Sequence, residues 1–137
     1  MNRDDLKELT KIRLKEAKLL LDHGKYSGAY YLCGYIVECA LKACIAKLTR
    51  RYDFPDKKRA NESYTHNLSD LVKVAGLVAS LNTEKTSDPT FEINWKVVIT
   101  WDESSRYTTH GQAEAQGLYQ AIADRRHGVL KWIKQHW

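Results

Sequence analysis

The chain has few of the residues that cross-link or interrupt a fold: its 137 residues include two prolines, seven glycines and three cysteines. Cys33, Cys39 and Cys44 all lie within one short stretch. Three residues of one straight helix cannot all pair with each other, and an odd number leaves one thiol over, so we expect no disulfide framework. Reduced, buried thiols in a cytoplasmic protein are the simpler interpretation.

Signals for secretion and for common catalytic sites are also lacking. The stretch from Met1 to Glu16 is charged throughout and contains no apolar core of a signal peptide. We see no glycine-rich phosphate loop, nucleophile–base triad or paired-carboxylate motif. His23, His127 and His136 have no acid or cysteine at metal-ligand spacing. We therefore expect neither a metal nor a cofactor, and these absences argue weakly against an ordinary enzyme.

What the chain does contain is one strongly apolar segment, Tyr26–Leu48. Apolar residues recur there at helical spacing, at Tyr30, Cys33, Val37, Ala40, Leu41, Cys44, Ile45 and Leu48. Glu38 and Lys42 interrupt the run four residues apart, so they share one face of the helix. A helix this apolar, interrupted by two charges, is expected at the centre of a helical bundle and not in a membrane.

A first amphipathic helix is predicted from Arg3 to Asp22, with Leu6, Leu9, Ile12, Arg13, Ala17 and Leu20 in helical period. Asn2 is a suitable N-cap, and His23-Gly24 ends the helix in the usual manner. Because so short a connection joins it to the helix from Tyr26 to Leu48, the two are expected to pack antiparallel.

Two further helices are predicted, from Leu68 to Ser80 and from Gln112 to His136, the second broken or bent at Gly128. Residues 49–67 form a polar, charged loop in this interpretation, and residues 82–90 form a second polar loop.

The segment Phe91–Trp101 is ambiguous. Its apolar residues alternate with mostly polar ones, which is typical of a strand. Asp88-Pro89, however, is a favourable start for a helix, and a lone strand would have no partner elsewhere in the chain. We expect a short helix. The whole chain, residues 1–137, is then a single all-α domain, an antiparallel up-and-down bundle of four to five helices.

The charge balance is mildly basic, with 22 Lys and Arg against 17 Asp and Glu and a formal net charge of +5. This permits contact with RNA or another anion but does not identify a nucleic-acid-binding protein. Within residues 49–67, Arg50, Arg51, Lys57, Lys58 and Arg59 could follow a phosphate backbone. Acidic residues dilute this cluster, so a solvated loop is the preferred interpretation.

Several motifs together resemble the HEPN (higher eukaryotes and prokaryotes nucleotide-binding) domain family. They are the opening RLKEAKLLLDHGKYSGAYYL, the central GYIVECALKA, the element THNLSDL, the W-x5-W-x4-RY segment and the closing GVLKWIK. The resemblance implies a helical bundle that commonly dimerises. It also implies one of two roles: a metal-independent ribonuclease or toxin component, or a non-catalytic partner of nucleotidyltransferases and other defence proteins.

Ribonuclease members of the family carry an Arg, a polar residue and, after a spacer of about four to six residues, a His. In this chain, Arg106 and His110 are separated by three residues, and Tyr107 stands at the polar position. Arg59 and His66 have a spacer of six, but they lie in the charged loop rather than near the later helix. We therefore favour a non-catalytic domain that binds a nucleotide, RNA or a partner protein. The alternative is a metal-independent ribonuclease that uses Arg106 and His110 across a dimer.

Glu38 and Lys42 have a structural and a functional interpretation. A carboxylate in an apolar run has to be paired, and either Lys42 or Arg106 could pair with it. Arg106, followed by Tyr107, is also the best candidate in the chain for binding a phosphate or carboxylate. The predicted binding residues are therefore Glu38, Lys42, His66, Arg106 and Tyr107, and the catalytic candidates are Arg106 and His110.

The remaining candidates are expected to be structural. His66 is predicted to cap or hydrogen-bond the helix that begins at Leu68, and His110 to lie on a surface loop unless a dimer partner covers it. Tryptophans 95, 101, 132 and 137 are predicted to pack in the core and not to stack on bases. The apolar C-terminal residues must be covered by something, and together with the resemblance they predict a homodimer.

Overall fold

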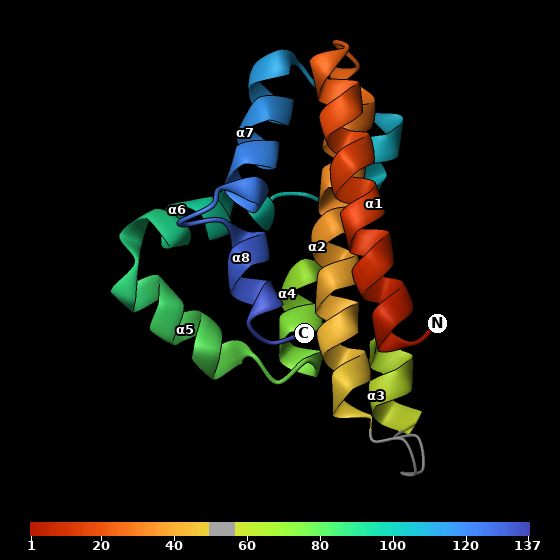
Figure 1. Cartoon of the computed structure of the whole chain (residues 1–137), viewed down its shortest axis with the longest axis vertical. Coiled ribbons are helices and arrows are strands. Elements are labelled where there is room, and N and C mark those ends of the chain that lie inside the picture. The colour runs from red at the N-terminus through yellow and green to blue at the C-terminus, as the bar shows by residue number, and fades with distance from the viewer. Residues whose placement is uncertain (50–56) are drawn as a thin grey trace.

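The computed structural model describes residues 1–49 and 57–137, and within them every regular element is helical. Two long helices stand side by side, and several of the shorter ones pack against the second (Figure 1). The α-helices are α1 (Arg3–Asp22), α2 (Tyr26–Leu48), α3 (Lys57–Glu62), α4 (Leu68–Val74), α5 (Val78–Ser87), α6 (Pro89–Val98), α7 (Gln112–Ala123) and α8 (Val129–Lys134); η1 (Glu103–Tyr107) is a 3₁₀ helix. The predicted all-α bundle is confirmed.

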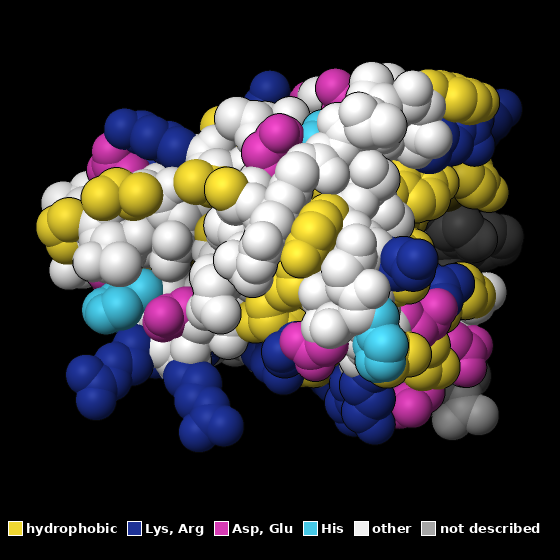
Figure 2. Space-filling view, turned by 90° about the horizontal axis from the view of Figure 1, so that it is seen from above, with side chains coloured by type: hydrophobic (Ala, Val, Ile, Leu, Met, Phe, Trp, Pro, Cys, Tyr) yellow, Lys and Arg dark blue, Asp and Glu magenta, His cyan; other side chains and the backbone are white. Residues whose placement is uncertain are grey.

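Charged side chains of both signs are mixed on the surface. On the face seen in Figure 2, Lys and Arg lie around the margin with Asp and Glu between them. Many are paired along one helix, as Lys18 is with Asp22 at 2.5 Å. This face therefore lacks the continuous basic stripe that is typical of proteins that follow a nucleic-acid backbone.

The α1–α2 hairpin forms as its sequence predicts. The Asn2 side chain accepts a hydrogen bond from the Asp5 amide, and the Asp5 carboxylate accepts one from the Asn2 amide, which together form a capping box. Gly24 has a φ of +73°, a left-handed conformation that allows the chain to reverse directly into α2. Ile12 is the exception to the predicted inward face, because 42% of its surface is exposed.

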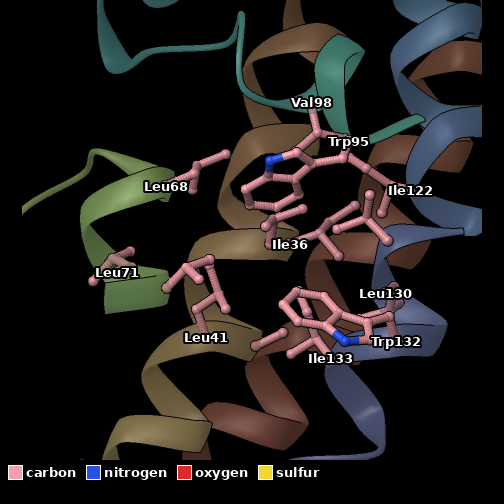
Figure 3. Close-up of a cluster of buried hydrophobic side chains, with 14 of the residues drawn as sticks. Ile36, Leu41, Leu68, Leu71, Trp95, Val98, Ile122, Leu130, Trp132 and Ile133 are labelled. Carbon is pink, nitrogen blue, oxygen red and sulfur yellow. The ribbon is translucent and has the colours of Figure 1, made fainter. Parts of the chain in front are cut away.

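Helix α2 is the centre of the core, as expected. Its 23 residues are long and apolar enough to cross a membrane by length and composition alone. However, 67% of its most apolar stretch is buried inside the protein, as in the core helix of a bundle. Ile36 and Leu41 point from α2 into the cluster that Trp95, Ile122 and Trp132 complete (Figure 3).

The chain between α2 and η1 contains more helix than the sequence analysis predicts. Residues 57–62, assigned to a loop, form α3. The helix expected from Leu68 to Ser80 ends at Val74, because Gly76 has a φ of +71° and turns the chain. A new helix, α5, then occupies most of the predicted second loop and continues to Ser87.

The ambiguous segment is the helix α6, as predicted. Its N-cap is Asp88, whose carboxylate accepts a hydrogen bond from the Phe91 amide at 3.1 Å, and Pro89 occupies the first turn. Phe91, Trp95 and Val98 face the core, which is the spacing of a helix and not of a strand.

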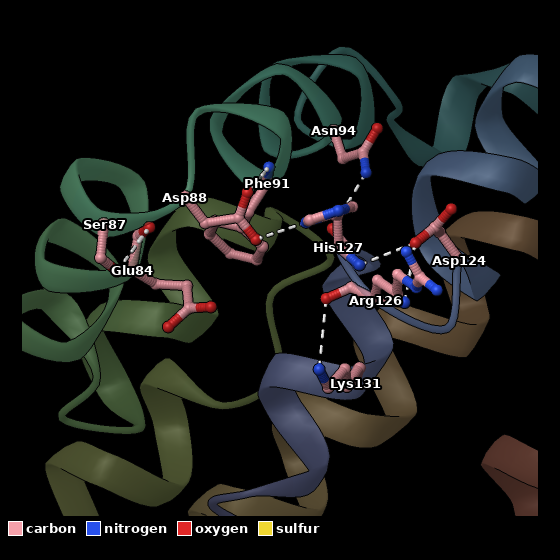
Figure 4. Close-up of polar contacts among 9 residues, drawn as sticks. All are labelled: Glu84, Ser87, Asp88, Phe91, Asn94, Asp124, Arg126, His127 and Lys131. Carbon is pink, nitrogen blue, oxygen red and sulfur yellow. Dashed lines mark hydrogen bonds and ion pairs between the residues drawn. The ribbon is translucent and has the colours of Figure 1, made fainter.

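Polar contacts hold α6 to the turn between α7 and α8 (Figure 4). His127 Nδ1 lies 2.7 Å from Asp88 Oδ2, and the Asn94 side chain donates to the His127 carbonyl at 2.9 Å. Asp124 accepts hydrogen bonds from the amides of Arg126 and His127. The hydrogen bond from His127 lowers the pKa of Asp88.

The C-terminal segment breaks at Gly128, as predicted. A Cβ at this position would overlap the backbone of Asp124 and Ile122, so the close turn requires glycine. The apolar residues of α8 then pack inward, with Val129, Trp132 and Ile133 at most 2% exposed. The core of the same chain therefore covers this segment, so its apolar residues no longer argue for the predicted homodimer.

Candidate functional site

Glu38 is the one acidic side chain that is buried among the described residues, at 3% exposure. Its Oε1 accepts a hydrogen bond from Lys42 Nζ at 2.8 Å and lies 2.7 Å from His66 Nδ1. The predicted pairing with Lys42 is therefore confirmed, and the predicted pairing with Arg106 is wrong. His66, expected to cap the next helix, instead contacts the carboxylate, while Asn67 caps α4 through the Asp70 amide.

A cavity of about 470 Å³ lies beside this cluster, between the start of α4 and η1. We call it the α4–η1 cavity; its lining includes Thr65, His66, Ser69, Ile99, Trp101 and Asp102. Leu68, Glu103 and Ser104 also contribute to it. His66 therefore connects the buried carboxylate of Glu38 with an open volume that is large enough for a small molecule.

Trp101 forms the inner wall of the α4–η1 cavity and was not a sequence-predicted site residue. Its indole packs directly over Gly34 on α2, where a Cβ would overlap the ring. Tyr35 contacts the same indole edge-on, with ring centroids 5.3 Å apart, and lies 6.0 Å from the His66 ring. The signal in the sequence was Gly34 itself, because a glycine inside a helix often marks a close approach.

Three buried polar atoms in this region have no hydrogen-bond partner among the described residues: Glu38 Oε2, Trp101 Nε1 and Ser105 Oγ. The three residues are 3%, 3% and 6% exposed, respectively. Burying a polar group without a partner costs about 1–3 kcal/mol, so such groups in one region are unusual and point to function.

His110 lies in the loop before α7, as expected, but it is half-buried and is held by contacts within the chain. Its ring stacks on Tyr30 of α2, with centroids 3.7 Å apart and planes 14° apart. Nδ1 lies 2.8 Å from a Glu114 carboxylate oxygen, and Nε2 lies 2.8 Å from the Thr108 hydroxyl. Its amide donates to the Ser27 hydroxyl at 2.9 Å. These contacts attach the start of α7 to α2 and occupy both ring nitrogens.

Arg106 projects from η1 as an exposed side chain, beside Tyr107, of which 77% is exposed. The guanidinium lies 4.7 Å from the Tyr107 ring centroid, within cation–π distance. Interaction with Tyr107 and with Tyr31 raises the pKa of Arg106 further. The structure therefore brings together the predicted residues as two groups: Glu38, Lys42 and His66 around the buried carboxylate, and Arg106 with Tyr107 on the surface.

The basic cluster contributes less to a site. Arg50 and Arg51 lie outside the described residues. Lys58 lies on α3 and pairs with Glu62 at 3.9 Å, as in a solvated helix. Across residues 1–49 and 57–137, no group of three or more His, Cys, Asp or Glu side chains could hold a metal ion.

Three features place the chain in a class of small helical domains. It is an antiparallel bundle with short loops, its second helix is apolar and central, and a turn that carries an arginine precedes a later helix. The family model of the HEPN domain matches residues 4–115. The chain therefore belongs to the HEPN domain family, which is generally related to nucleotides and RNA. No curated protein and no solved structure matches the chain.

Proposed function

We propose that this chain is a non-catalytic HEPN domain that binds a nucleotide or RNA through a phosphate-binding surface at Arg106 and Tyr107. The observation that carries the proposal is the packing of His110. A general base needs a ring nitrogen within reach of the proton it removes. Both nitrogens of His110 already have partners within the chain, and Tyr30 covers one face of the ring.

Arg106 has the opposite character. Its guanidinium is exposed, permanently charged and supported by an exposed aromatic ring, a combination that suits a phosphate with a stacked base or sugar beside it. A surface that combines an exposed arginine with a histidine whose ring nitrogens already have partners supports recognition of a phosphate without cleavage.

Incubating the purified protein with mixed-sequence RNA in EDTA tests the proposal. We expect no cleavage by the wild type, and weaker RNA binding by Arg106→Ala with a salt dependence reduced by about one charge. Arg125→Ala, which removes an exposed arginine from the α7–α8 turn, is the matched control and should lower binding less. His110→Ala should bind RNA as the wild type does.

The second candidate function is a metal-independent ribonuclease assembled from Arg106 and His110 of two protomers, favoured by family membership. Cleavage that persists in EDTA and disappears in both Arg106→Ala and His110→Ala would replace our proposal with this one. Absence of both cleavage and binding would instead indicate a protein-interaction role, with a nucleotidyltransferase or another defence protein as the partner.

We also propose a cytoplasmic location, on the basis of the three free, buried cysteines, and a homodimer, on the basis of the family alone. Light scattering at high micromolar concentration tests the homodimer, since a monomer would have a mass of about 15.8 kDa. A monomer would remove the composite ribonuclease site together with the dimer and would leave the binding proposal intact.

A further inference from the structure

We propose that the α4–η1 cavity binds a nucleobase that carries an exocyclic amine, such as adenine. This inference rests on the proposed nucleotide or RNA ligand and adds a second contact region, which recognises the base and not the phosphate. It is carried by the shape and the charge of the cavity and by unpaired polar atoms in and beside its lining.

The cavity has the dimensions and walls of a heterocycle site. Its volume of about 470 Å³ lies in the range of small-molecule pockets. Leu68, Ile99 and the Trp101 indole give it apolar surfaces, and the imidazole of His66 is a flat neighbour. Ile99 is 41% exposed, which leaves apolar surface that a bound ring would cover.

The unpaired atoms require a ligand with both donors and acceptors. Trp101 Nε1 can only donate a hydrogen bond, Glu38 Oε2 can only accept one, and the Ser105 hydroxyl can do either. A nucleobase edge offers both kinds of group, whereas a phosphate offers acceptors and an ammonium offers donors. Of the three residues, Trp101 belongs to the lining, whereas Glu38 contacts the lining residue His66 and Ser105 follows the lining residue Ser104. All three atoms are shielded from solvent, so side chains of the rim must move before a ligand can bond to them.

The charge of the cavity favours an amine over a phosphate. Asp102 and Glu103 lie in its lining, which contains no Lys or Arg among the described residues. Lys42 is close, but it is already bonded to Glu38. A phosphate would therefore meet unpaired negative charge, while an exocyclic amine would meet acceptors.

His66 supplies a directed acceptor. Because the Glu38 carboxylate accepts a hydrogen bond from Nδ1, the neutral ring carries its proton there and leaves Nε2 as an acceptor. His66 lines the cavity, so an amine placed there can donate to Nε2. Arg106 belongs to η1, the same short helix that supplies Glu103 and Ser104, so one nucleotide could contact both regions.

The test is titration of the protein with adenosine and with purine riboside, which lacks the amine, by calorimetry and by the Trp101 indole NMR resonance. We expect adenosine to bind about tenfold more tightly than purine riboside, because the acceptors would otherwise stay unpaired. Ser69→Phe, which fills the cavity, should abolish binding, while Ser87→Phe on exposed α5 should not. His66→Gln should weaken binding about tenfold, and its control His23→Gln should not.

Each outcome separates this inference from the proposed function. If no nucleoside binds but RNA binds in an Arg106-dependent manner, the cavity inference fails and the proposed function stands. Equal adenosine binding by Ser69→Phe, checked to be folded by circular dichroism, would place the nucleoside elsewhere and overturn the inference. Binding of arginine amide in preference to adenosine would show that the cavity takes a basic side chain. Adenosine binding that survives Arg106→Ala supports the cavity as a separate region.

Discussion

Replacing Gly34 by alanine tests the packing on which the site depends. Gly34 lies in the middle of α2 and is buried, and a Cβ there would overlap the Trp101 indole, which is itself 3% exposed. Overpacking a well-filled core costs about 1–3 kcal/mol. Alanine gains about 1 kcal/mol over glycine in a helix interior. Because Tyr35 contacts the same indole, Trp101 cannot move freely, and we expect the upper part of the overpacking range.

The net loss in the free energy of unfolding is then about 1–2 kcal/mol. For 137 residues, an unfolding entropy of about 0.29 kcal/mol/K converts this loss into a Tm lower by about 3–7 °C. Gly117→Ala is the control, because Gly117 is an exposed residue of α7 and no atom of the described residues lies within 4 Å of an added Cβ. It should raise the Tm. Calorimetry and the Trp101 indole resonance measure both effects. A Gly34→Ala protein that is as stable as the wild type, with an unshifted indole resonance, would refute the reasoning.

Two further predictions concern buried and half-buried charges. Lys42→Met should lower the free energy of unfolding by about 1–3 kcal/mol, because Glu38 would lose a partner while it stays buried. Lys73→Met, which removes an exposed ion pair at 3.9 Å, should change the free energy of unfolding by less than about 1 kcal/mol in denaturant titrations. Equal losses of stability in Lys42→Met and Lys73→Met would contradict this prediction. Asp88→Asn keeps the N-cap but loses the charged contact to His127. Because that contact lowers the pKa of Asp88 in the folded state, it stabilises the protein at neutral pH and is lost as the pH falls through the lowered value. The Tm difference between Asp88→Asn and wild type should therefore be largest near neutral pH and smaller at acidic pH. A Tm difference that is constant with pH would contradict this prediction.

The parts of the fold that local sequence determines were predictable. The capping box at Asn2, the reversal at Gly24 and the cap at Asp88 each depend on residues within a few positions of one another. Helix α2 was predictable because its apolar run has no other stable place than the centre of the core. Helix α5 was missed because it buries little: Leu81 is its one buried residue, so its sequence has the polar character of a loop.

The site was predicted in part, and for a different reason. Burial of Glu38 made a partner necessary, and Lys42 was visible four residues away. His66 comes from 28 positions further along the chain, and only tertiary packing brings it to the same oxygen. The α4–η1 cavity could not be predicted at all, because it depends on the tertiary packing of the Trp101 indole against Gly34.

The spacing of Arg106 and His110 has less influence on the direction of the His110 side chain than the sequence suggests. On a helix, one residue fewer would turn a side chain by about 100°. The chain leaves the 3₁₀ helix between them, however, because Thr108 is extended, with a ψ of 158°. The direction of His110 therefore depends on its contacts with Tyr30, Thr108 and Glu114.

Releasing the His110 ring is consequently the sharpest test of whether nuclease chemistry is latent. Stacking on Tyr30 and the hydrogen bond to Thr108 contribute about 1–3 kcal/mol together, so a free ring would be present in about one molecule in 5 to one in 150. If His110 were a restrained catalytic base, Thr108→Val combined with Tyr30→Leu, which removes both of these contacts, would raise RNA cleavage in EDTA by a similar factor. We expect no cleavage from this variant, because a released imidazole still lacks a substrate phosphate positioned by a second Arg106. Cleavage that rises in the double variant and disappears when His110→Ala is added would refute the non-catalytic assignment.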